Sequence, residues 1–417
     1  MENKRLSEVY YWIVTIIILT LHNLTTPTYN PDTYYYVDAI NRIFNGIPDC
    51  LRTPTYPIIL WIFNVNNSDT TSAGVTIFQS LIYLVSVYSF KNICESTIKN
   101  KTLSKSVRYV YILFFFPSWC NELITESLCI SGIIILIDLI IQTINKPKLG
   151  KSILSTILLT VLYFLRPTFV IFIIFLPIYY LYIWYKTKAK EYLTNICLII
   201  IPLSFLILYC YSFNQQYGSF SSSITSECNT IDHLKESKMW NPKIVIDEKA
   251  YSAIMHFDKN VYGDYSGLFC YVSGNGNVDL IDKACKNMIN ADKKQFIRQK
   301  IGNFYRSTGG FFISWNDRHS DTLSSILCFF GRFFSFPLNI FYIFALTSPL
   351  ALLFDYKRSK SLDFKQTLII AILFSYTVGI VYAALNSHSR LLAPVLPLFL
   401  VYTAYLFENT VLPIFKK

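Results

Sequence analysis

The sequence predicts an all-α polytopic membrane protein with about ten transmembrane helices and one polar domain outside the membrane. Hydrophobic residues make up 53% of the 417 residues and charged residues 15%, and the mean hydropathy is +0.38. Soluble globular domains carry about 25% charged residues, so this composition cannot cover a water-exposed surface of the required size. The apolar residues also fall in blocks near the roughly 20 residues that span a bilayer. Intrinsically disordered chains, nucleic-acid modules and small disulfide scaffolds are therefore excluded.

Ten apolar blocks are long enough to be counted as spans. They lie at 9–25, 73–90, 107–119, 124–144, 152–165, 167–185, 192–212, 326–354, 366–385 and 391–408. The third and fifth blocks are short, and the apolar segment 56–65 is only half as long as a span. The number of spans is therefore fixed only to within one or two. The first block follows Lys4 and Arg5, and because no small-residue cleavage site comes after it, we expect an uncleaved first helix.

The basic residues set the predicted orientation. The net charge is +11, but most Lys and Arg residues sit in short clusters between apolar blocks, as topology signals do. These clusters alternate so that both termini lie on the cytoplasmic side and the long segment 213–325 lies outside. The inner clusters are nearly all lysine, whereas the short outer connections contain only arginines: Arg42, Arg52, Arg166 and Arg390. Arginine is the side chain that binds phosphate or carboxylate in a bidentate manner.

Charged residues near the outer membrane level are the candidates for chemistry, because such groups are costly and usually functional. Segments distant in sequence bring acids and arginines to this level, and only Asp138 breaks the pattern. A transporter places its charges near the midplane on broken helices, often in repeated halves. The sequence shows no internal repeat. The outer-level set is Asp32, Asp38, Arg42, Asp49, Arg52, Glu122, Glu126, Arg166, His388 and Arg390.

The first outer loop, 26–72, is the most informative stretch. Pro31 after Asn30 is typical of a helix start, and Asp32 then lies in the first turn. On such a helix Asp32, Tyr35, Tyr36 and Ala39 share one face. We expect this helix to lie along the membrane interface, with its aromatic rings in the headgroup layer.

The long outer segment 213–325 is polar and large enough for a small domain. Ser219–Ser226 has the composition of a flexible linker, Gly263–Asn277 is rich in turn residues, and 279–305 is predicted to be one amphipathic helix. Its role, acceptor recognition or a lid over the site, stays open. Ten cysteines show no CxxC pair or zinc-like spacing, so no metal or redox centre is inferred. A disulfide among Cys228, Cys270 and Cys285 and three free thiols are both compatible with the sequence.

Four motifs in this order resemble the GT-C membrane glycosyltransferases, especially the protein mannosyltransferases and the lipid A aminoarabinose transferases. The first is Pro-Asp-x-x-x-Tyr-x-x-Ala from Pro31, followed by a glycine and by Arg-x-Pro-x-Tyr-Pro from Arg52. The others are Thr-Glu at 125–126, Arg166-Pro167, and Ser389-Arg390-Leu-Leu-Ala-Pro-Val-Leu-Pro. The chain departs from these relatives at Leu391, where they have an aromatic residue, and at Thr33, where the mannosyltransferases have a second acidic residue. Because no Asp-x-Asp occurs, a metal-bridged pyrophosphate donor, as in oligosaccharyltransferases, is disfavoured.

The resemblance implies transfer of one sugar from a polyprenyl-phosphate carrier to a glycan, lipid or protein acceptor, with inversion, without a metal or other cofactor, on the outer face. Asp32 is then the candidate base. The candidates for binding the donor phosphate are Arg52, Arg166, Arg390 and His388. The candidates for lining the substrate site are Tyr36, Asp38, Tyr56 and Glu126. Glu126 is also a candidate for orienting one of the arginines. Each has an ordinary alternative, such as a helix-end charge for Asp32 or an interfacial snorkelling side chain for Arg166.

The predicted organisation is an N-terminal transmembrane module (1–212), the outer domain (213–325) and a C-terminal transmembrane module (326–417). We expect a multi-pass protein of a bacterial inner membrane, active on cell-envelope glycans in the periplasm. The expected partners are the bilayer, the lipid-linked sugar and the acceptor, and we expect no nucleic-acid partner. An O-antigen-type polymerase or ligase, which would concentrate its arginines around the large loop, is the first alternative. A lipid or solute transporter is the second.

Overall fold

The computed structural model describes residues 2–24, 31–65, 72–113, 116–259, 276–308, 337–359, 363–383 and 388–412. Within these ranges the chain is helical and contains no strand, which confirms the predicted class. Two apolar helices are shorter than a span, Leu149–Leu165 and Leu338–Phe354. Seven helical segments of the described chain are long and apolar enough to cross a membrane: Leu6–Asn23, Ser72–Thr97, Glu126–Asn145, Pro167–Thr187, Glu191–Tyr217, Phe364–Val381 and Arg390–Thr410.

The third predicted span, 107–119, is not a continuous helix. Helix α5 (Lys101–Leu113) ends within it, and a separate 3₁₀ segment, η2 (Phe116–Asn121), follows. Pro117 has no backbone N–H and clashes with the preceding turn, so an α-helix cannot run through it without a break. The first part of the eighth predicted span, 326–336, lies outside the described residues.

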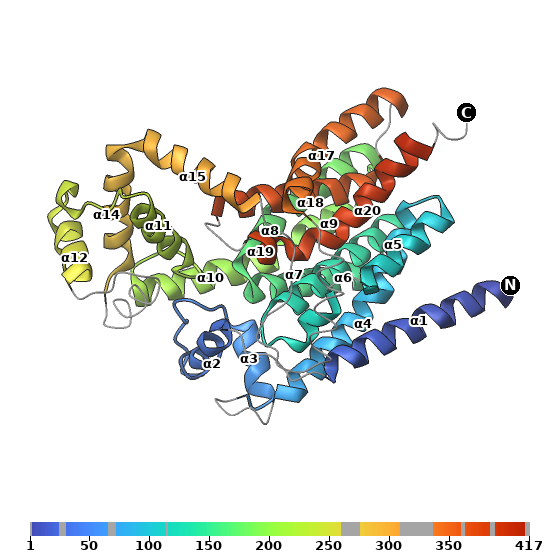
Figure 1. Ribbon diagram of the computed structural model, residues 1–417, viewed down its shortest axis with the longest axis horizontal. Helices are drawn as coiled ribbons and strands as arrows, with labels where there is room; N and C mark the ends of the chain where they lie inside the picture. Colours follow the sequence, from blue (N-terminus) through green and yellow to red (C-terminus); the bar gives the residue numbers. More distant parts are fainter. Residues whose placement is uncertain are drawn as a thin grey trace.

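Helix α6 (Glu126–Asn145) is the centre of the membrane bundle (Figure 1), and 78% of its apolar window is buried. It packs against α4 (Ser72–Thr97) on one side and α7 (Leu149–Leu165) on the other. Small side chains permit this close packing, as is common between membrane helices. At Gly132 of α6, an added Cβ would lie 2.6 Å from a methyl carbon of Leu162 on α7.

The remaining helices of the bundle complete one shared core. Helix α18 packs onto α6 and α8, α20 packs onto α6, and α17 packs onto α18 and α20, so the described helices before and after the outer domain belong to a single bundle. The bounds are α1 (Glu2–Asn23), η3 (Pro167–Phe169), α8 (Val170–Thr187), α9 (Glu191–Leu198), α10 (Ile200–Tyr217), α17 (Leu338–Ser359), α18 (Phe364–Ala383), α19 (His388–Leu392), η5 (Ala393–Val395), α20 (Leu396–Leu406) and η6 (Phe407–Val411).

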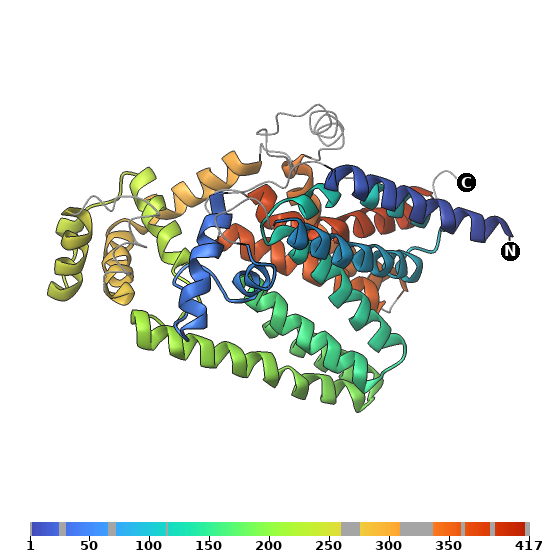
Figure 2. The same ribbon diagram turned by 90° about the horizontal axis from the view of Figure 1, so that it is seen from below.

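One end of the bundle carries the outer domain, and the start of α1 and the end of α20 lie at the opposite end in both views (Figures 1 and 2). The first outer loop folds into α2 (Pro31–Phe44) and α3 (Thr55–Ile62) at the domain end. Helix α2 begins at Pro31, as the sequence predicts. Tyr36 and Ala39 on its inner face are buried.

In its described residues, the segment that the sequence predicts to be the outer domain forms α11 (Thr225–Glu236), η4 (Pro242–Ile244), α12 (Glu248–Lys259), α14 (Val278–Ala291) and α15 (Lys293–Thr308). It has its own apolar core, which includes Ile231, Ile254 and Ile281. Cys50 and Leu51 of the first outer loop belong to the same core. The hydroxyl of Tyr217 also donates a hydrogen bond of 2.7 Å to the carbonyl of Pro48. The outer domain is therefore attached directly to the loop that carries Arg52.

One expectation for this domain is corrected, and one point that the sequence left open is answered for two cysteines. The segment 279–305 forms two helices rather than one, because Asp292 leaves helical geometry (φ −148°, ψ 73°) between α14 and α15. Cys228 and Cys285 are free thiols buried in the domain core. Burial in apolar surroundings stabilises them as neutral thiols. Cys270 lies outside the described residues.

Candidate active site

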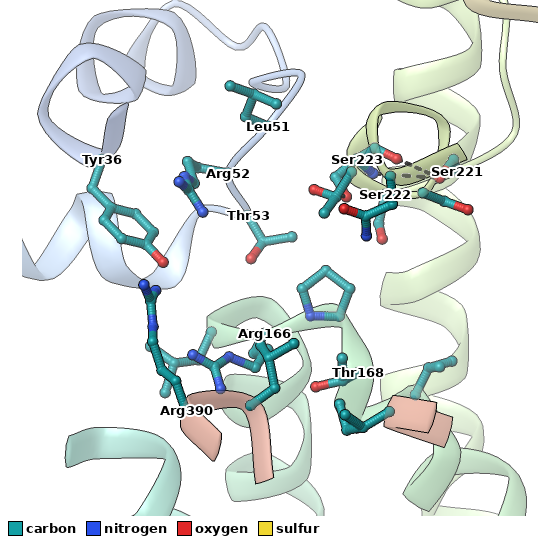
Figure 3. A pocket seen from close by; sticks show the side chains of 18 residues that line it. Tyr36, Leu51, Arg52, Thr53, Arg166, Thr168, Ser221, Ser222, Ser223 and Arg390 are labelled. Atoms are coloured by element: carbon teal, nitrogen blue, oxygen red, sulfur yellow. Dashed lines mark hydrogen bonds between the residues drawn. The ribbon is translucent and has the colours of Figure 1, made fainter. Parts of the chain in front are cut away.

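A cavity of about 370 Å³ opens where the segment between α2 and α3, the ends of several bundle helices and the beginning of the outer domain meet (Figure 3). Its volume is within the range of small-molecule sites, about 300–1,000 Å³. Three arginines that are far apart in sequence line it: Arg52, Arg166 and Arg390. Figure 3 shows their side chains on one side of the cavity and a run of serines on the other.

Asp32 connects two of these arginines. Nη2 of Arg52 donates to Oδ1 of Asp32 at 2.6 Å, and Nη2 of Arg390 donates to the other carboxylate oxygen. The backbone of Arg52 is fixed separately, because its N–H donates to Oδ1 of Asp49 at 2.7 Å. Asp32 thus lies behind Arg52 and Arg390, both of which face the cavity.

Glu126 is the second carboxylate of the cluster, and it is fully buried at the start of α6. Its Oε1 accepts a bond from Nη2 of Arg166 at 2.5 Å and another from Nε of Arg390. Arg166 donates as well to the hydroxyl of Thr125 at 3.0 Å. One guanidinium group, that of Arg390, therefore bridges Asp32 and Glu126 with two different nitrogens.

Local backbone geometry explains how Arg166 reaches this point. Helix α7 ends at Leu165, Arg166 is extended (φ −152°, ψ 118°), and Pro167 begins the short segment η3. The residue before a proline is driven out of the helical region, so the Arg166-Pro167 pair turns the arginine away from the helix axis. The predicted break between two apolar helices at this pair is confirmed.

The cluster keeps an excess of positive charge. Three guanidinium groups face two carboxylates, Asp32 and Glu126. Burial favours the neutral form of Asp32, but the charges of Arg52 and Arg390 outweigh it and hold the pKa of Asp32 below its usual range. Burial and the nearby charge of Glu126 raise the pKa of Glu122 well above its usual range, which favours its neutral form. The net charge of about +1 is suited to an anionic ligand.

Aromatic rings support the arginine side of the cavity. The Arg52 guanidinium carbon lies 4.6 Å from the centre of the Tyr36 ring, and Tyr36 lines the cavity. The Tyr56 ring packs edge-on against Tyr36 at 4.9 Å. Tyr56 itself does not line the cavity, because it is completely buried and its hydroxyl donates to Gln79 at 3.2 Å. The structure therefore places Tyr56 behind Tyr36 and not in the lining of this cavity, while its contact with substrate stays a prediction.

Asp38 is also separate from the cavity. It is exposed on α2 and pairs with Arg42, which in turn contacts Asp49 at 3.3 Å. Asp32 and Asp38 point to different sides of the helix because their spacing is not close to a whole number of turns. His388 begins α19, but its side chain lies outside the described residues.

Two features of the site were not anticipated from sequence. Gln79 of α4 donates to the carbonyls of Cys120 and Glu122, both at 2.9 Å, and so holds the segment that leads into Glu126. The Ser/Thr-rich stretch at the start of the outer domain, interpreted above as a linker, forms part of the cavity wall. A glutamine inside the apolar block 73–90 was the only sequence signal for the first, and the second had none.

No family model matches this sequence, and no curated protein matches it. Among solved structures, the chain is similar to the oligosaccharyltransferase of Archaeoglobus fulgidus in the apo form, with a TM-score of 0.48 and 10% identity over 98% of this chain and 52% of that chain. It is likewise similar to the archaeal oligosaccharyltransferase AglB from Archaeoglobus fulgidus in complex with an inhibitory peptide and a dolichol-phosphate, with a TM-score of 0.47 and 11% identity over the same shares. The chain therefore spans about half the length of these neighbours. The likeness at this level carries no argument about its chemistry.

Proposed function

We propose that this chain is a GT-C-type glycosyltransferase that moves a single sugar from a polyprenyl monophosphate to an acceptor hydroxyl at the outer membrane face. The observation that carries the proposal is the convergence of Arg52, Arg166 and Arg390 on one cavity at the end of an apolar helical bundle. Arginine forks bind phosphate oxygens in a bidentate manner. The excess positive charge of the cluster supports one phosphate group as the ligand.

The proposed reaction needs one base and one group that accepts negative charge. The acceptor oxygen attacks the anomeric carbon, its proton passes to a carboxylate, and the bond between that carbon and the phosphate oxygen breaks. The electron pair of the broken bond stays on the phosphate. Preset positive groups beside that oxygen stabilise the transition state, and attack from the side opposite the leaving group inverts the anomeric centre.

Asp32 is the proposed base. Its pKa is held below its usual range, so the carboxylate is ionised and able to accept a proton at neutral pH. In the present arrangement both of its oxygens are bound by arginines that also face the cavity. A donor phosphate competes for these same guanidinium groups. Binding of the donor therefore frees an oxygen of Asp32 next to the reacting carbon.

Glu126 has a different proposed role. Because it is fully buried and binds Arg166 and Arg390 at once, it orients both arginines rather than touching substrate. The reaction is proposed to need no metal ion, since the position after Asp32 is Thr33. The hydroxyl of Thr33 donates to the carbonyl of Leu123 at 2.7 Å and so has a structural role.

The test is transfer of radiolabelled sugar by the purified full-length chain in vesicles, with EDTA present. Polyprenyl monophosphates carrying one sugar are compared with pyrophosphate-linked oligosaccharides. Transfer from a monophosphate donor in chelator supports the proposal. Activity on pyrophosphate-linked oligosaccharides alone points to the polymerase, and activity on a monophosphate donor that is abolished by EDTA contradicts the metal-independent mechanism.

A further inference from the structure

Two parts of the cavity lining are polar and differ chemically, and apolar side chains form much of the rest. One wall carries the three arginines and Tyr36, as described above. The other consists of side chains with hydroxyl or amide groups from the beginning of the outer domain (Figure 3). These side chains belong to Ser221, Ser222, Ser223, Thr225, Ser226 and Asn229. We call this second set the hydroxyl wall.

The hydroxyl wall is held in place against the loop that carries Arg52. The backbone N–H of Ile224 donates to the carbonyl of Cys50 at 2.8 Å, and Ile224 is completely buried. Within the wall, Oγ of Ser221 donates to the carbonyl of Ser223 at 2.8 Å. A fixed array of neutral donors and acceptors is thus built opposite the arginines.

Neither an acid nor a base belongs to the hydroxyl wall, and the three arginines are the only charged side chains among the described residues that line the cavity. Hydroxyl and amide groups both donate and accept hydrogen bonds, which matches the hydroxyl groups of a sugar. A free amine on the sugar would find no carboxylate in this lining, other than the Asp32 oxygen that takes up the proton of the acceptor, and would lie near three positive charges. The lining therefore favours a neutral sugar.

Resting on the function proposed above, we infer that the hydroxyl wall recognises the donor sugar and selects one that is neutral and carries no free amino group. In a glycosyl phosphate the phosphate is attached directly to the sugar. When the arginines hold the phosphate, the sugar occupies the remaining space of the same cavity, in front of the hydroxyl wall. This assigns sugar selection to Ser221–Asn229 of the outer domain.

The experiment measures binding of two kinds of lipid to the full-length chain in detergent. One is a polyprenyl phosphate without sugar, and the other is the same lipid carrying glucose, galactose, mannose or an amino-arabinose. The variant combines Thr225→Val with Ser226→Ala, which removes two hydroxyls from half-buried and exposed positions. Thr230→Val is the matched control, because Thr230 lies on the same helix, does not line the cavity, and bonds only to the carbonyl of Ser226 at 2.9 Å.

The wild-type chain is expected to bind its preferred neutral glycosyl lipid more tightly than the bare lipid. Each lost hydroxyl is expected to weaken that binding by roughly fivefold, as for a neutral hydrogen bond. Binding of the bare lipid changes by less than about twofold. Thr230→Val changes neither. Arg52→Lys weakens both lipids, which shows that the assay detects phosphate binding.

Equal weakening of both lipids by the double variant, or no effect on the glycosyl lipid, overturns the assignment. So does tighter binding of the amino-arabinose lipid than of every neutral one. If the double variant binds the donor as wild type does but has a raised KM for the acceptor, the hydroxyl wall contacts the acceptor, and this result also contradicts the inference. If the wild-type chain binds none of these lipids, the proposed function itself fails.

Discussion

Arg390 provides the sharpest prediction because a single guanidinium group bridges Asp32 and Glu126 while facing the cavity. In Arg390→Lys the positive charge remains, but one ammonium nitrogen replaces two donor nitrogens that a rigid planar group holds at fixed positions. The variant therefore loses at least one hydrogen bond to a charged group. Such bonds contribute about 1.5–3 kcal/mol each. This corresponds to a fall in kcat/KM of roughly 10- to 150-fold.

The matched control is Arg42→Lys. Arg42 also contacts two carboxylates, Asp38 and Asp49, but it does not line the cavity. The assay is the initial rate of sugar transfer from the monophosphate donor at several donor concentrations. We expect the large loss for Arg390→Lys and a change of less than about threefold for Arg42→Lys. Equal losses in the two variants, or an Arg390→Lys rate within threefold of wild type, would refute the reasoning.

Three further predictions concern stability, pH and packing. Glu126→Gln removes the buried counter-charge of Arg166 and one of the two carboxylates that bind Arg390, so we expect destabilisation by about 3–5 kcal/mol, measured as a lower unfolding temperature in detergent. The pKa of Asp32 is lower in the folded protein than in the unfolded chain, so its ion pairs are intact at neutral pH and are lost only when the pH falls to this lowered pKa. We therefore expect kcat/KM to stay flat between pH 7 and pH 5. Arg52→Gln removes one of the two charges that depress this pKa and is expected to move the acid limb of the pH profile upward; an unchanged limb would show that another group controls it. Gly132→Val is expected to cost about 1–3 kcal/mol through overpacking against Leu162, and adding Leu162→Ala should recover part of the loss. Failure of this rescue would contradict the close approach of α6 and α7.

Local chain signals were sufficient to predict the helices that position the site. Pro31 marks the start of α2, and Arg166-Pro167 marks the break after α7, because proline restricts its own backbone and that of the residue before it. Long apolar runs identified most of the bundle. The prediction failed at 107–119, where an apolar run was given more weight than the proline inside it.

Which charged residues pair with one another could not be predicted from local signals of this kind. The sequence indicated that arginines and acids gather at one level, but the Arg390–Glu126 pair joins residues 264 positions apart. The helical spacing puts Asp32 and Asp38 on different sides of α2, but it does not show which of the two sides meets the arginines. Only the rotation of α2 against its neighbours decides this.

The hydroxyl wall escaped prediction for a related reason. Serine and threonine are common in turns because their side chains bond to nearby backbone groups, so a run of them is typical of a linker. In the structure, the bond from Ile224 to the carbonyl of Cys50 turns that run into a fixed surface. The break between α14 and α15 at Asp292 was not predicted either, because no glycine or proline lies there to indicate a helix end.

Asp32→Asn tests the central claim most directly, with Asp38→Asn as the matched control on the same helix. Both variants replace a carboxylate of α2 by a neutral amide, but only Asp32 contacts the arginines of the cavity. The measurement is sugar transfer from a polyprenyl monophosphate in EDTA, with binding of the sugarless lipid as a check that the site is intact. If Asp32 is the base, its variant loses at least about a hundredfold in kcat while Asp38→Asn stays close to wild type. Full activity of Asp32→Asn, or an equal loss in Asp38→Asn, would contradict the account.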